Sequence, residues 1–275
     1  MKRRIRLVPS VLVLLAALAA LPFGAAAAPG PALDIHFVPT PEDAVKRMLE
    51  MAEVKPSDVV YDLGSGDGRI VISAVRDFKA RKGIGVDLDP VRVQEGIANA
   101  KAAGVSDRVQ FIEGNVFKVD FSEATVVTMY LLTRINIDLR PRILNELRPG
   151  TRVVSHQFDM GDWEPDETEH VGKATLYAWT VPAKVEGSWK WEMDGNGYQL
   201  QIEQRYQKVS GNLSGGGPGA PIRYGLIKGD RLTFEAPVRG GGTMRFDGKV
   251  VGKDAIEGIV SAGGSSQKIV ARRAN

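Results

Sequence analysis

Three glycines that alternate with polar residues follow a short apolar stretch and precede an apolar-rich segment. They are Gly64, Gly66 and Gly68 in the run Asp62-Leu-Gly-Ser-Gly-Asp-Gly. The apolar residues around Asp62 predict a buried strand, and the glycines predict a tight turn before a helix. Such a turn presents free backbone N–H groups at a helix N-terminus, where only glycine lets a ligand approach the main chain. The run therefore predicts a seat for a nucleotide-type cofactor.

The spacing of these glycines excludes two familiar nucleotide motifs. A dinucleotide fingerprint needs its third glycine where Arg69 stands, and a Walker loop needs a Gly-Lys-Ser/Thr ending that is absent here. A second acid, Asp87, comes 19 residues after Gly68, at the end of the next apolar stretch. A carboxylate at that place accepts hydrogen bonds from both hydroxyls of a ribose. Asp62 is a further acceptor, which either orients the glycine turn or meets a ligand ammonium group.

Three short runs together resemble a known family. They are Asp62-Leu-Gly-Ser-Gly-Asp-Gly, Gly85-Val-Asp and Gly114-Asn-Val. In these runs the chain is similar, over roughly residues 38–181, to the class I (seven-β-strand) S-adenosylmethionine-dependent methyltransferases. Within that class, Val38-Pro-Thr-Pro together with residues 62–69 resembles the branch that includes the non-SET protein lysine methyltransferases, some of which modify subunits of ATP synthase.

The resemblance implies S-adenosylmethionine as the cofactor. The cofactor-binding residues that it implies are Thr40, Asp62, Gly64, Ser65, Gly66, Gly68, Asp87, Leu88, Asn115 and Val116. Asp62 and the glycines would hold the methionine moiety, Asp87 the ribose, and Asn115 with Val116 the adenine edge and face. Position 115 usually carries Asp in the class, and the carbonyl oxygen of Asn115 can still meet the adenine amino group. From the residues alone, Thr40 is either a helix cap or a cap whose backbone also borders the cofactor.

The acceptor side of the site is less defined. A sulfonium methyl is already a good electrophile, so the protein needs only to hold a nucleophile in line and exclude water. Because ligands sit beyond the carboxyl ends of strands in open α/β sheets, Tyr130 and His156 are the candidate catalytic residues. Each has a structural alternative, packing for Tyr130 and an ordinary strand-end role for His156. The acids and Trp163 of residues 159–163 either select a cationic substrate such as lysine or form a polar loop. With no His-x-x-x-His or paired-acid cluster, we expect no metal site.

The N-terminus has the parts of a secretory signal. Four basic residues lie within residues 1–6, an apolar run covers residues 11–21, and small residues lead to Ala28. We predict a signal peptide over residues 1–28, cleaved after Ala28, and export, most simply to a periplasm. The alternative is an uncleaved membrane anchor, but Pro22 interrupts a run that would need about 20 apolar residues to span a bilayer. After cleavage we expect no stable membrane span.

Removing the signal changes the meaning of the charge. Without its four basic residues, 32 Lys and Arg face 33 Asp and Glu, a net charge of −1. No basic face is then required, and nucleic acid becomes an unfavoured partner. The absence of cysteine excludes disulfides, thiol nucleophiles, cysteine-based zinc sites and a lipid anchor on cysteine.

Patterning along the chain predicts two folded domains. Strand and helix alternate through residues 38–182, which predicts an α/β, Rossmann-like, doubly wound and mostly parallel sheet closed by an antiparallel hairpin. Residues 184–275 lose helical periodicity and predict a small all-β antiparallel barrel or sandwich. The segments whose bounds matter below are helices over 41–51 and 137–147, strands over 124–132 and 152–158, seven strands after residue 186, and a glycine-rich loop over 212–221.

These expectations define two functions. The first is methyl transfer from S-adenosylmethionine to a protein side chain, lysine favoured, or to a small molecule. The second is an exported, non-catalytic binding module that retains a nucleoside pocket while its β domain contacts a ligand or an envelope partner. Export and the cofactor are in tension, because S-adenosylmethionine is in general a cytosolic metabolite. The sequence leaves the acceptor, the role of the β domain and the oligomeric state open.

Overall fold

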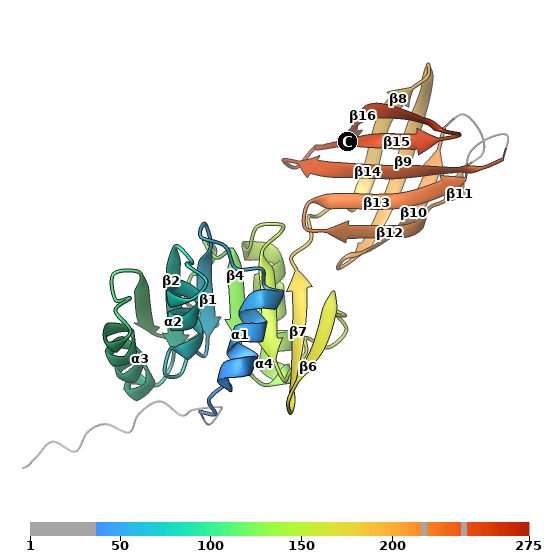
Figure 1. The fold of residues 1–275 in the computed structure, drawn as a ribbon. Helices are drawn as coiled ribbons and strands as arrows, with labels where there is room; N and C mark the ends of the chain where they lie inside the picture. The colour runs from blue at the N-terminus through green and yellow to red at the C-terminus, as the bar shows by residue number, and fades with distance from the viewer. Residues whose placement is uncertain (1–36, 216–218, 238–240, 275) are drawn as a thin grey trace, which may run out of the picture. The chain divides into compact units, whose positions relative to one another are not determined.

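The chain folds into an α/β domain followed by a β-barrel. The computed structural model describes residues 37–215, 219–237 and 241–274, so the predicted signal peptide lies outside the described residues. Figure 1 shows the α/β part in blue to yellow and the β part in yellow to red. The predicted fold class is confirmed.

The first sheet has seven strands in the order β3-β2-β1-β4-β5-β7-β6. Its strands are β1 (Val59–Leu63), β2 (Lys82–Asp87), β3 (Val109–Glu113), β4 (Val126–Met129), β5 (Arg152–His156), β6 (Glu167–Val171) and β7 (Ala174–Thr180). The first five are parallel, and the hairpin β6–β7 joins β5 in antiparallel pairing. The order reverses between β1 and β4, which is the position where open α/β sheets bind ligands.

Four helices cover the two faces of this sheet. They are α1 (Glu42–Met51), α2 (Arg69–Arg76), α3 (Pro90–Ala102) and α4 (Thr133–Glu146). Residues of α1, α2 and α3 pack in one buried apolar cluster, and Ile135, Leu139 and Ile143 of α4 pack in another. The continuous burial of β1 and β4 follows from this double cover, because both of their faces lie against helices.

Several predicted bounds need correction. Helix α1 begins at Glu42 with Pro41 as its N-cap residue and no side-chain cap, so Thr40 does not cap it. Helix α4 begins at Thr133 rather than residue 137, because the N–H groups of Ile135 and Asn136 already donate to the carbonyl of Leu132. Strands β4 and β5 are shorter than predicted and end at Met129 and His156.

The second domain is a closed antiparallel barrel. Its strands are β8 (Gly187–Met193), β9 (Asn196–Arg205), β10 (Lys208–Ser214), β12 (Arg223–Lys228), β13 (Arg231–Pro237), β14 (Thr243–Val251), β15 (Ala255–Ala262) and β16 (Ser265–Arg273), with the short β11 (Ala220–Pro221) beside β10. Pairing of β8 with both β9 and β16, and of β9 with β10, closes the ring. Between the predicted barrel and sandwich, the structure has the barrel.

Aromatic and aliphatic side chains fill the barrel interior. Phe234 and Phe246 stack with ring centroids 4.8 Å apart, and Trp191 stacks on Tyr198 at 5.5 Å. Trp191, Phe234 and Phe246 belong to one buried apolar cluster drawn from the strands of the barrel, and the partly buried Tyr198 packs against it. The interior is therefore a packed core, as is usual for a barrel of this size.

Strand β10 was not predicted, and part of it lies in the stretch predicted to be a glycine-rich loop. The strand carries Gly211 where its alternation needs an apolar residue. A Cβ at Gly211 would lie 2.0 Å from the carbonyl oxygen of Gln201 on β9, so no side chain fits there. Because β9 and β10 approach closely at this position, only glycine fits there. The apolar alternation that would have identified β10 in the sequence is therefore interrupted.

The described helices of the chain include none with both the length and the apolar character needed to cross a membrane.

Candidate functional site

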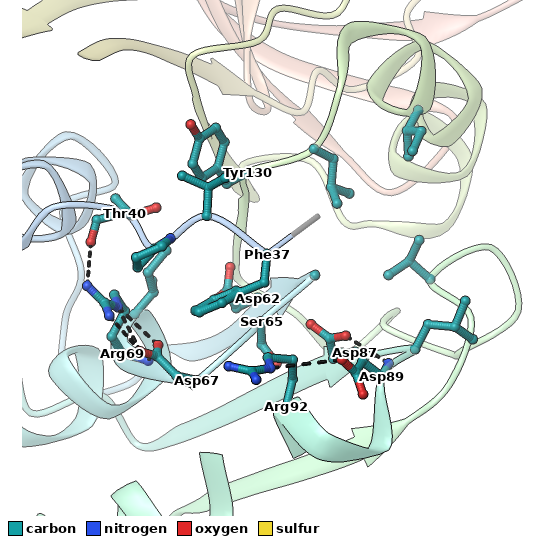
Figure 2. A pocket seen from close by; sticks show the side chains of 18 of the residues that line it. Phe37, Thr40, Asp62, Ser65, Asp67, Arg69, Asp87, Asp89, Arg92 and Tyr130 are labelled. Carbon is teal, nitrogen blue, oxygen red and sulfur yellow. Dashed lines mark hydrogen bonds and ion pairs between the residues drawn. The ribbon is translucent and has the colours of Figure 1, made fainter. Parts of the chain in front are cut away.

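A cavity of about 170 Å³ lies at the carboxyl ends of β1, β2 and β4. Figure 2 shows the labelled side chains around it. The sequence-predicted residues that line it are Thr40, Asp62, Gly64, Ser65, Asp87, Leu88, Asn115, Val116 and Tyr130. The other predicted residues, Gly66, Gly68 and His156, are not among the described residues that line the cavity.

The glycine turn follows β1 and is tied to β2. The N–H groups of Gly64 and Ser65 both donate to the carbonyl of Val86, at 2.8 and 2.9 Å. Gly64 has a φ of +82°, and a Cβ there would lie 2.7 Å from a methyl carbon of Leu131. The hydroxyl oxygen of Ser65 is buried and has no hydrogen-bond partner among the described residues. The N–H groups of Gly66 and Gly68 are bonded as well, to Asp87 and to the carbonyl of Ser65, so the free backbone donors expected from the sequence are engaged within the protein.

Asp62 carries the main electrostatic feature of the cavity. Its side chain is buried, and one carboxyl oxygen accepts a hydrogen bond of 2.8 Å from the Thr128 hydroxyl. Burial raises the pKa of Asp62 to about 8, although the hydrogen bond from Thr128 acts in the opposite direction. Asp87 and Asp67 add to the rise through repulsion between like charges. A ligand ammonium beside Asp62 would relieve this cost, because an opposite charge favours the ionised carboxylate.

Asp87 connects the turn after β1 with the turn after β2. One carboxyl oxygen accepts the Gly66 N–H at 2.7 Å, and the other accepts the Asp89 N–H at 3.0 Å. Each carboxyl oxygen has a second lone pair, so the fixed carboxylate can still accept the hydroxyls of a ribose. The side chain of Asn115 is used partly within the protein, because its carbonyl oxygen accepts the Phe117 N–H at 2.8 Å.

Residues before α1 complete the cavity, and sequence reasoning missed most of them. The Phe37 ring lies over Gly66, where a Cβ would come within 2.2 Å of a ring carbon. The guanidinium of Arg92 lies 4.8 Å from the centre of the same ring. Arg69 pairs with Asp67 and donates to the carbonyl of Thr40 at 2.9 Å, which holds the segment in place. The signal that could have found Arg69 and Asp67 is their place within the glycine motif itself.

Gly68 serves packing rather than ligand contact. It has a φ of +80° and precedes the first residue of α2. A Cβ there would lie 2.4 Å from the ring of Phe111 on β3 and 3.4 Å from Gly96 on α3. The third glycine of the motif thus lets α2 approach its neighbours.

The two candidate catalytic residues lie together, but only Tyr130 reaches the cavity. His156 is buried, with ring centroids 3.9 Å from Tyr130, and its Nδ1 lies 3.1 Å from the Thr40 hydroxyl. Burial lowers the pKa of His156 below its usual value, which favours the neutral ring at pH 7. His156 therefore lies in contact with two cavity residues without lining the cavity itself.

The loop over 159–163 has a structural role. Asp162 pairs with Arg140 at 2.5 Å and Arg205 at 3.0 Å, and side-chain hydrogen bonds from these two guanidinium groups, Arg205 first, lower its pKa to about 2. Trp163 is buried and donates its Nε1–H to the side-chain oxygen of Gln207. Asp162 and Trp163 are thus both engaged by side chains of the protein itself.

The residues of the cavity fit a sulfonium nucleoside. An ammonium would pair with the buried Asp62, a ribose with the fixed Asp87, and an adenine would lie near Asn115 and Val116. Together with the sheet order, this site defines a class I S-adenosylmethionine-dependent methyltransferase.

Comparison with known proteins narrows the class. A family model described as the ANTKMT methyltransferase domain matches residues 62–167. A protein-lysine N-methyltransferase of Saccharolobus islandicus is 53% identical over 133 residues, which cover 48% of this chain and 83% of that protein. The adenine nucleotide translocase lysine N-methyltransferase of Mus musculus is 31% identical over 155 residues, covering 56% of this chain and 66% of that protein.

A solved structure agrees with the fold. The RNA methyltransferase from Salinibacter ruber, in complex with S-adenosyl-L-homocysteine, is 54% identical with a TM-score of 0.53, covering 54% of this chain and 96% of that chain. The present chain belongs to the protein-lysine N-methyltransferase family, and its cofactor is S-adenosylmethionine.

Proposed function

We propose that the chain methylates the side-chain amine of lysine in a protein. The observation that supports a lysine acceptor is the acidic character of the first domain. The carboxyl groups of Asp62, Asp67, Asp87 and Asp89 line the cavity with the guanidinium groups of Arg69 and Arg92, and burial keeps the carboxyl group of Asp62 largely protonated near pH 7 in the free protein. Residues 29–183 as a whole hold 24 acidic and 18 basic residues. Such an acidic excess favours a basic protein segment over a phosphate backbone as the partner.

The residues have few chemical tasks in this reaction. Bound S-adenosylmethionine supplies the methyl group on a positively charged sulfur. Asp62 would orient the ammonium group and Asp87 the ribose, which fixes the direction of the reactive end. Tyr130 and Leu131, at the end of β4, and Phe37, before α1, line the cavity and reduce its access to water. The attacking amine must be neutral, so the lysine ammonium first loses one proton to water, which frees the nitrogen lone pair for the attack.

The acceptor class is tested by labelling. Purified protein is incubated with methyl-labelled S-adenosylmethionine and a cell extract, and aliquots are digested with ribonuclease or with protease. We expect label that survives ribonuclease and is recovered as methyl-lysine after acid hydrolysis. Label lost with ribonuclease would assign the activity to RNA, as in the name of the Salinibacter ruber structure. Binding without label transfer would support the non-catalytic binding module.

The cofactor site is tested by Asp87→Ala. Because Asp87 fixes the Gly66 N–H and is expected to accept the ribose hydroxyls, we expect the affinity for S-adenosylmethionine to fall about 10- to 100-fold in calorimetry. The control is Asp107→Ala, which removes an exposed carboxylate outside the cavity. Equal affinities in the two variants would refute the assignment of Asp87.

We also propose that the mature chain begins after Ala28 and acts outside the cytoplasm. The basic start, the apolar run and the small residues before the site support this. Fractionation of native cells with N-terminal sequencing tests it: a mature N-terminus at Pro29 in the exported fraction is expected, and an intact N-terminus in the cytosol would refute it.

A further inference from the structure

The chain makes a strained turn directly after β5. Gln157 has a φ of +67°, although it is not a glycine, and the Phe158 N–H donates to the carbonyl of His156 at 2.9 Å. A three-residue turn with positive φ at its centre is rare because an ordinary side chain is strained there. Strain of this kind persists only where surrounding contacts hold it, and it is common at functional sites.

Contacts from β5 itself and from two other elements, β7 and α4, hold this turn. The Gln157 N–H donates to the carbonyl of Thr175 on β7 at 2.6 Å. The carbonyl of Phe158 accepts the Ser155 hydroxyl at 2.6 Å and the side-chain amide of Asn136 at 3.0 Å. Asn136 lies on α4 and is fully buried. The position of Phe158 is therefore fixed by the sheet edge and by α4 together.

The turn directs two rings against Tyr130. The rings of Phe158 and Tyr130 are stacked, with centroids 6.0 Å apart and planes inclined by 28°. His156 lies against Tyr130 at 3.9 Å and is within hydrogen-bond distance of Thr40. Tyr130 lines the cavity, while Phe158 and Tyr130 are both partly exposed. A continuous aromatic surface thus extends from the cavity at the end of β4 to the end of β5.

We propose that Tyr130 and Phe158 form the wall against which the acceptor amine lies, with His156 as a positioning residue behind Tyr130. This inference rests on the proposed function, because it assigns the binding site of the lysine side chain. In the reaction the nitrogen lone pair forms a bond to the methyl carbon as the carbon–sulfur bond breaks. Positive charge passes from sulfur to nitrogen, sulfur leaves as a neutral thioether, and the product is a methylated ammonium, because the one proton released in the reaction leaves the lysine ammonium for water before the attack.

An aromatic wall suits this movement of charge. The face of a ring attracts a cation, and methylated ammonium groups are bound by such rings in proteins. The wall can therefore stabilise the charge that develops on nitrogen without a carboxylate. Carboxylates of the neighbouring loop have other partners, since Asp159 accepts the Gly161 N–H at 3.2 Å and Asp162 pairs with Arg140 and Arg205.

The test uses a cation that imitates the methylated product. The purified protein, saturated with S-adenosylhomocysteine, is titrated with n-butyltrimethylammonium and, separately, with a neutral tert-butyl analogue of the same shape, and binding is followed by NMR. We expect the cation to bind more tightly than its analogue. Phe158→Leu, which keeps an apolar side chain but removes the ring, should weaken cation binding at least about threefold. Phe158→Tyr should restore it.

Matched measurements separate binding from folding. Tyr224→Leu removes a strongly exposed ring of the barrel and should leave cation binding unchanged. The affinity for S-adenosylhomocysteine should be equal in all variants. Three results would each contradict the proposed aromatic wall. They are equal binding of the cation and its analogue, no binding of the cation to the wild type, and no effect of Phe158→Leu on cation binding. A parallel loss of S-adenosylhomocysteine affinity would also contradict the wall, because Phe158 would then be merely structural.

The positioning role of His156 has its own readout. His156→Phe keeps a ring beside Tyr130 but removes the contact with Thr40, and His156→Asn keeps a polar group but removes the ring. If the ring positions Tyr130, His156→Phe should retain cation binding and His156→Asn should lose it; the reverse order would overturn the role. If cation binding depends on Phe158 but the protein methylates no lysine, the aromatic wall is supported and only the proposed function is refuted.

Discussion

The ionisation of Asp62 opposes stability in the free protein. Burial raises the pKa of Asp62 to about 8, above its unfolded value of about 3.9. A carboxyl group with a raised folded-state pKa contributes stability that is complete below the unfolded pKa and is lost as pH rises through the folded pKa. We therefore expect the melting temperature of Asp62→Asn to exceed that of the wild type at pH 8, with the difference shrinking toward pH 5. The difference in the free energy of unfolding between the two proteins changes by at most about 1.4 kcal/mol for each pH unit. Asp107→Asn should melt in parallel with the wild type.

The same substitution should harm cofactor binding. A ligand ammonium needs the ionised carboxylate, so the affinity for S-adenosylmethionine should increase from pH 6 to pH 8 in the wild type and stay flat in Asp62→Asn. Calorimetry at pH 7 in two buffers of different ionisation enthalpy should show a proton released on binding. An affinity of the wild type that does not change over this range would contradict the role of Asp62. The stable, weakly binding variant would show that the carboxylate is kept for function.

At the level of elements, local patterns predict what local interactions determine. The strand, glycine turn and helix around Gly64 were predictable because apolar runs and glycines mark them within a dozen residues. Thr40 was predicted to cap α1, but its hydroxyl instead contacts His156, which lies 116 residues away. The turn at Gln157 likewise depends on Thr175 and Asn136. Contacts of such long sequence separation leave no trace in the local pattern.

The third glycine of the motif offers a prediction about element packing. We expect Gly68→Ala to lower the free energy of unfolding by about 2–5 kcal/mol, the sum of about 1–2 for a left-handed backbone and about 1–3 for overpacking against Phe111. Gly104→Ala is the matched control, since Gly104 has a φ of +70° and open space around a Cβ, so only the backbone part should remain. Chemical denaturation compares the two. Equal losses would show that Gly68 is required for its conformation alone.

At the scale of the whole molecule, charge divides between the two domains. Residues 184–275 hold 14 basic and 9 acidic residues, in contrast to the acidic excess of residues 29–183. The net charge of −1 predicted for the mature chain conceals this division, because an overall sum contains no information about placement. The β-rich character of the second domain was predictable from its alternation, whereas its closure into a barrel depends on the pairing of β9 with β10, a strand that the pattern did not contain.

The segment between β5 and β6 joins the two domains through buried polar contacts. Trp163, which packs in the core of the first domain, donates its Nε1–H to Gln207 at 3.0 Å, and the amide of Gln207 donates to the carbonyl of Glu164 at 2.7 Å. We expect Gln207→Leu to lower stability by about 1–3 kcal/mol, because it leaves the buried indole N–H without a partner. Gln201→Leu, at an exposed position of β9, should change stability by less than about 0.5 kcal/mol. Denaturation followed by tryptophan fluorescence compares the variants, and similar midpoints for both would show that the junction adds nothing to the stability of the chain.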